Sequence, residues 1–163
     1  MLLLKSASPI TPSSRNFLNK TPIMDCPSSG SRAFAFRLKP KDDLKKSILA
    51  FAEENKIKAG SIVTGAGSLE QFRFANQKKG EVKKGFFEMA SLTGTFSGTS
   101  CHLHLSVSDH EGKTLGGLLL DDNIIYTTAE VTVIDLTELE FKRAPEATYG
   151  FNELVVGQRK HGA

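Results

Sequence analysis

One helical pattern followed by a long series of strand patterns most restricts how this chain can fold. Apolar residues from Leu44 to Ala52 recur at the i, i+4, i+7 and i+8 spacing of one helix face, and Asp42 or Asp43 is placed to cap that helix. The other regular apolar runs favour strands, at residues 33–38, 57–63, 69–75, 85–94, 102–108, 113–120, 124–133 and 136–142. An early helix followed by antiparallel strands indicates an α+β fold rather than a doubly wound one.

The length of 163 residues corresponds to one globular domain. Residues 1–31 hold seven serines and four of the six prolines, so we expect a disordered tail, with a transit peptide or an upstream extension ahead of Met24 as alternatives. We place the folded domain at 32–157 and a short polar tail at 158–163. No apolar run reaches the roughly 18 residues of a membrane helix, so we expect no membrane contact.

The net charge of +3 lies in the N-terminal part of the chain. Residues 1–32 carry four basic residues and one acidic residue, whereas residues 33–163 carry 17 of each and are neutral. A nucleic-acid-binding domain usually has a basic excess, so DNA contact would need a local patch. The candidate patch is Lys78, Lys79, Lys83 and Lys84, and a solvated hairpin loop is the alternative. Two cysteines favour reduced thiols and the cytoplasm, with nuclear or mitochondrial location as alternatives.

Two histidines form the most informative chemical pattern. His102 and His104 alternate with apolar residues along one predicted strand, so both rings project from the same face, about 6–7 Å apart along the backbone. Two converging imidazoles are half of a site for Zn²⁺ or another divalent metal, and a catalytic site needs a third protein ligand. Glu88 and Glu130 are candidates for that ligand or for a general base. The alternative is a polar cleft without metal.

Several segments, in this order, resemble the plant and prokaryote conserved (PPC) domain, also called the AT-hook-associated domain. They are residues 65–69, 87–94 and 102–109, then Gly112, Gly116-Gly117, Glu130, Arg143 and the closing segment 148–154. The resemblance implies a homotrimer with a strongly curved antiparallel sheet similar to acetolactate decarboxylase, a metal-dependent enzyme. It also implies a metal site made by His-x-His and a third histidine. His102 and His104 match the first two ligands, but Leu118 occupies the third position, where Glu130, Glu88 or His110 would have to substitute.

These features together predict a stand-alone PPC-domain protein without an AT-hook. We expect a homotrimeric binding or scaffolding module with a polar pocket at or near the subunit boundary, associated with DNA or transcription through partner proteins. The alternative is a small metal-dependent enzyme of the decarboxylase or lyase type, in which His102 and His104 hold the metal and Glu88 or Glu130 moves the proton.

Overall fold

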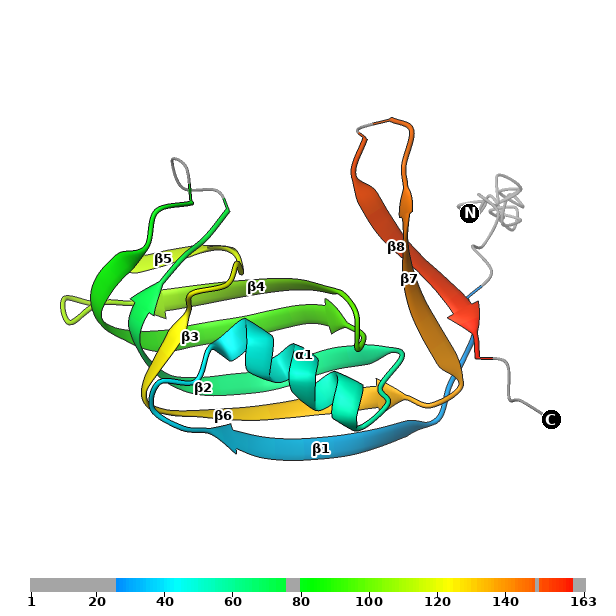
Figure 1. Ribbon diagram of the computed structural model, residues 1–163, viewed down its shortest axis with the longest axis horizontal. Helices are drawn as coiled ribbons and strands as arrows, with labels where there is room; N and C mark the ends of the chain where they lie inside the picture. The colour runs from blue at the N-terminus through cyan, green and yellow to red at the C-terminus, as the bar shows by residue number, and fades with distance from the viewer. Residues whose placement is uncertain (1–25, 76–79, 149, 160–163) are drawn as a thin grey trace, which may run out of the picture.

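The computed structural model describes residues 26–75, 80–148 and 150–159, and within them an antiparallel sheet carries one helix (Figure 1). The six-stranded sheet has the order β1-β6-β2-β3-β4-β5, with every neighbouring pair antiparallel. Its strands are β1 (Ser31–Leu38), β2 (Gly60–Phe72), β3 (Lys83–Phe96), β4 (Cys101–Ser108), β5 (Thr114–Leu118) and β6 (Ile124–Leu136). This arrangement confirms the predicted α+β class with one early helix.

Helix α1 (Leu44–Glu54) lies across one face of the sheet (Figure 1). Its side chains Leu44, Ile48 and Ala52 are completely buried, as the helical spacing predicted. Asp43 is the N-cap: its Oδ1 accepts a hydrogen bond from the Lys46 amide at 3.1 Å, and its Oδ2 accepts one from the Asp122 amide at 2.7 Å. One carboxylate therefore fixes both the start of the helix and the turn that precedes β6.

The opposite face of the sheet, which we call the outer face, carries no helix among the described residues. The remaining two strands, β7 (Leu139–Pro145) and β8 (Asn152–Gln158), pair only with each other, and this hairpin projects from one end of the sheet (Figure 1). Within the described ranges, no helix has the length and hydrophobicity needed to cross a membrane.

Two strand predictions need correction. Residues 57–63 and 69–75 were expected to be separate strands around Gly65-Ala66-Gly67, but β2 runs continuously through these glycines. Gly67 has φ of 152°, and a Cβ there would lie 2.1 Å from the Thr128 carbonyl oxygen, so the glycine permits close approach of β6 instead of ending the strand. Strand β8 was not predicted, because its consecutive Leu154, Val155 and Val156 break the alternation that indicates a half-buried strand.

Candidate functional site

The two histidines of β4 lie side by side on the outer face. Leu103, Leu105 and Val107 point into the core with at most 1% exposure, so the alternate residues His102 and His104 face outward. Their Nε2 atoms are 3.1 Å apart, within hydrogen-bonding distance when one ring carries its proton on Nε2. The geometric expectation drawn from the alternating pattern therefore agrees with the structure.

A glycine on β3 fixes the backbone beneath this pair. Gly94 lies opposite Leu103 and has φ of 127°, and a Cβ there would meet the His102 carbonyl oxygen at 2.0 Å. Only glycine fits a position with that φ and so close a neighbouring carbonyl. The resulting register places Thr93 opposite His104 and Thr95 opposite His102.

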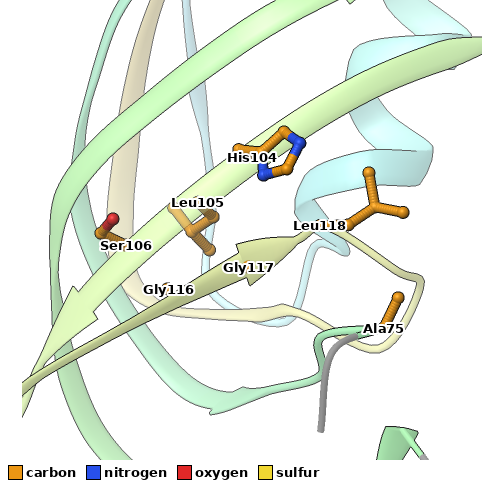
Figure 2. A pocket seen from close by; sticks show the side chains of 7 residues that line it. All are labelled: Ala75, His104, Leu105, Ser106, Gly116, Gly117 and Leu118. Carbon is orange, nitrogen blue, oxygen red and sulfur yellow. The ribbon is translucent and has the colours of Figure 1, made fainter.

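The position expected for a third ligand is directly beside the histidines. Leu118 of β5 pairs with His104, and Figure 2 shows the two side chains on neighbouring strands. Two zinc-bound imidazole nitrogens at tetrahedral geometry would be about 3.3 Å apart, so the observed 3.1 Å suits one metal ion. Leucine has no ligating atom, however. The three-histidine site that the family resemblance implies therefore does not fit this chain.

The carboxylates proposed as substitutes lie elsewhere on the sheet. Glu88 pairs with Ser108, about 13 Å along β4 from His104. Glu130 lies on β6, where it pairs with Arg37 and Ala66. Strand β6 is three strands away from β4 in the sheet, which corresponds to about 14 Å between the two strands. His110 lies in the turn after β4, beside Glu111. Across residues 26–75, 80–148 and 150–159, no group of three His, Cys, Asp or Glu side chains could hold a metal.

Two open hollows adjoin the histidine pair, and Leu118 lines both of them. The first has a volume of about 650 Å³ and lies at the β5 edge, lined by His104, Leu118, Ser106 and neighbouring residues (Figure 2). The second has a volume of about 510 Å³ and lies between β4 and the β7–β8 hairpin, where His102 and Arg143 both contribute to its lining. Both volumes are in the range of small-molecule sites.

Arg143 is the site residue that sequence reasoning missed as a functional group. Its Nη2 donates a hydrogen bond to Thr95 Oγ1 at 3.3 Å, and Thr95 is the residue opposite His102. The guanidinium therefore lies near the imidazole pair although 41 residues of sequence separate Arg143 from His102. Its match to the family pattern was the available signal, but nothing local to β7 indicated where that strand would lie.

Two ionisable groups near the site have displaced pKa values. Burial raises the pKa of the Cys101 thiol, and the positive charges of Lys45 and Arg143 partly offset this effect. A hydrogen bond from Lys45 lowers the pKa of Asp121, with which Lys45 forms a 3.0 Å ion pair. Cys101 and Cys26 are both free cysteines. Cys101 is therefore a poor nucleophile at neutral pH.

The lysine patch is only partly described. Lys83 and Lys84 are exposed at the start of β3, whereas Lys78 and Lys79 lie outside the described residues.

The sequence profile of the Plants and Prokaryotes Conserved (PCC) domain matches residues 27–137. The chain belongs to this family. It is the PPC family indicated by the sequence motifs. Among curated proteins, the chain is similar to the bifunctional protein GlmU of Synechococcus sp. strain JA-3-3Ab, with 36% identity over 132 residues. That match covers 80% of this chain and 21% of the GlmU protein, so the chain spans about a fifth of the length of this relative.

Solved structures show the same fold. A hypothetical protein from Salmonella cholerae-suis is 36% identical, with a TM-score of 0.78 over 82% of this chain and 99% of that one. A PPC protein from Pyrococcus horikoshii is 28% identical, with a TM-score of 0.63 over 78% and 93% of the two chains.

Two further solved structures share this fold. A metal-containing protein from Archaeoglobus fulgidus is 26% identical, with a TM-score of 0.61 over 78% of this chain and 95% of that one. A candidate DNA-binding protein from Bacteroides thetaiotaomicron is 22% identical, with a TM-score of 0.65 over 79% and 98%, a likeness of fold alone.

Proposed function

We propose that this PCC-domain chain is a homotrimeric binding and scaffolding module. The observation that carries the proposal is the position of its exposed apolar side chains. Of the eight large apolar residues exposed within the described ranges, three lie on the sheet (Val63, Phe86 and Tyr126) and four on or beside β8 (Phe151, Leu154, Val155 and Val156). Soluble monomers rarely leave such groups uncovered, so these two surfaces support a protein interface.

Phe86 and Tyr126 form a defined patch on the sheet. Tyr126 follows the buried Ile125, and Phe86 precedes Phe87, which packs against the core; both therefore point to the outer face. Their rings lie 4.6 Å apart although they come from β3 and β6. Phe86 is 68% exposed, so burial of this pair against another subunit would contribute substantially to association.

The β7–β8 hairpin supports the same proposal independently. A two-stranded hairpin is marginally stable in water unless something covers one face. A second copy of the chain is the occupant we propose, because residues 33–163 carry no net charge and copies would not repel one another. Closed cyclic assembly leaves no surface free for further growth. We take the number three from the homotrimers that the family resemblance implies.

Sedimentation equilibrium tests this proposal. The wild-type protein should have a mass of about 53 kDa, three times the 17.7 kDa of one chain. A Phe86→Ser/Tyr126→Ser variant should sediment as a monomer. The matched control is Val82→Ser, which removes an exposed apolar residue that directly precedes β3 and is not part of the Phe86–Tyr126 ring pair. A monomeric wild type, or a patch variant that keeps the wild-type mass, would refute the assembly.

The partners of such a module would be proteins, and we place its action in the cytoplasm. DNA or transcription would be reached through those partners, because the domain lacks a basic excess. The domain boundaries at residues 32 and 157, with a disordered tail before them, form part of this proposal.

A metal-dependent enzyme is the second candidate, favoured by the 3.1 Å separation of the two imidazole nitrogens. The strongly curved, acetolactate-decarboxylase-like form of the sheet is part of the proposal for both candidates. The chain supplies two histidine ligands, and a leucine occupies the position of the third ligand. We therefore derive no catalytic step from a metal at this site. Zinc analysis of purified protein distinguishes the candidates: about one equivalent per chain, lost in His102→Ala, would favour the enzyme.

A further inference from the structure

The hollow between β4 and the β7–β8 hairpin combines a positive charge with an apolar wall. Its sheet side includes His102 and Leu118, and its hairpin side includes Arg143, Phe151, Asn152 and Glu153. These groups come from strands of two separate sheets, so the hollow exists only when the hairpin is in place.

Arg143 is the charged group best placed to bind a ligand. It is half-buried, and its single side-chain hydrogen bond within the described ranges goes to the neutral Thr95 hydroxyl. No carboxylate in the described part of the chain forms an ion pair with it. A guanidinium has five N–H donors in a planar fork that matches a carboxylate or phosphate. An anion in the hollow would use donors that the protein leaves available.

The hollow has a second nitrogen-bearing side chain besides Arg143. Thr95 accepts a hydrogen bond from Arg143 and pairs with His102 across β3 and β4. The imidazole of His102 is therefore a second polar group near the guanidinium, on the sheet side of the hollow. The hollow therefore offers one guanidinium and one imidazole to an anion.

The rest of the lining restricts the ligand further. Phe151 is 69% exposed, and with Leu118 it offers an apolar wall to a hydrophobic ligand body. Glu153 adds one negative charge on the hairpin side, which disfavours a ligand with two negative charges. Asn152 and Glu153 can accept hydrogen bonds from a hydroxyl or amine.

We propose that this hollow binds a small organic carboxylate with an apolar body, with Arg143 as the anchor for the carboxylate and Phe151 and Leu118 against the body. Leu118 is then a specificity-determining residue. It stands where the family resemblance implies a metal-ligating histidine, and its side chain forms part of the apolar wall instead. Every lining residue belongs to one chain, and Phe151 is also part of the β8 surface that we propose to be covered in the trimer, so the ligand site and the assembly share this residue.

Calorimetry and ¹H–¹⁵N NMR titration with benzoate test the proposal. Benzoate should bind with a Kd of about 1 mM at low salt and shift the resonances of Arg143 and His102. Arg143→Gln should weaken binding at least about tenfold, because a charge-assisted bidentate contact is lost. The matched control is Arg37→Gln, since Arg37 also donates to an outer-face threonine hydroxyl, Thr128 at 3.0 Å, but lies on β1. Arg37→Gln should bind benzoate as wild type does.

A second ligand and a second variant keep the test decisive. Phenyl phosphate should bind more weakly than benzoate because of Glu153, and tighter phenyl phosphate binding would overturn the carboxylate assignment. If Arg143→Gln does not fold, the exposed Phe151→Ser should still fold and weaken benzoate binding several-fold. Absence of benzoate shifts in the wild type, or equal affinity in the Arg143 and Arg37 variants, would overturn the site. The mass measured by sedimentation shows separately whether assembly has changed.

Discussion

Replacing Leu118 by histidine should convert the histidine pair into a zinc site. Leu118 lies directly opposite His104, and opposed residues on neighbouring strands have Cβ atoms about 4.5–5.5 Å apart, within reach of a shared metal ion. The other two nitrogens are already 3.1 Å apart. Structural zinc contributes about 10–16 kcal/mol from four ligands, so one added ligand supplies about 3 kcal/mol, or about a hundredfold in affinity.

Competition with a fluorescent zinc chelator at pH 7.5 measures this gain. Leu118→His should compete about a hundredfold more strongly than wild type, and Leu118→Asn, which adds a polar group without an imidazole, should not. The combined variant His102→Gln/Leu118→His should lose most of the gain. An affinity for Leu118→His within about threefold of wild type would show that the register at β4–β5 does not bring the three rings together, and the reasoning about Leu118 would fail.

Two further predictions concern the backbone and the charge. Gly94→Ala should lower the free energy of unfolding by about 3 kcal/mol or more, because the new Cβ would lie 2.0 Å from a carbonyl oxygen at a residue with φ of 127°. Gly112→Ala, at a residue with φ of 79° and open space around it, should lower the free energy of unfolding by about 1 kcal/mol. Equal losses of the two variants in urea denaturation would contradict the close-approach argument. Because residues 33–163 are neutral, the protein should show no salt-dependent retention on duplex DNA, and retention that decreases in Lys83→Ala/Lys84→Ala would establish direct DNA contact.

Much of the fold was readable from local patterns. The spacing of Leu44, Ile48 and Ala52 gave the helix and its buried face, and an aspartate before it gave the cap. Strict alternation in β4 gave the direction of both histidines. These predictions succeed because the period of a helix or a strand is a property of consecutive residues, and burial of one face follows from it.

The surroundings of the histidines could not be obtained in this way. The family motif identified Leu118 as the third position, but the distances of Glu88 and Glu130 from His104 depend on strand order and on β-bulges such as the one between Met89 and Ser91. A one-residue change of register turns every side chain to the other face. No pattern within a single strand specifies that register.

The sequence by itself determined which residues are buried on helix α1 and strand β4, and that two imidazoles share one face. Only the tertiary structure decided that Arg143 lies beside Thr95 and His102, and that β8 leaves Phe151 and its neighbours exposed. The reason is that alternation and helical period act over a few residues, whereas the position of the β7–β8 hairpin depends on contacts between distant segments, such as the hydrogen bond from the Phe141 amide to the Lys58 carbonyl.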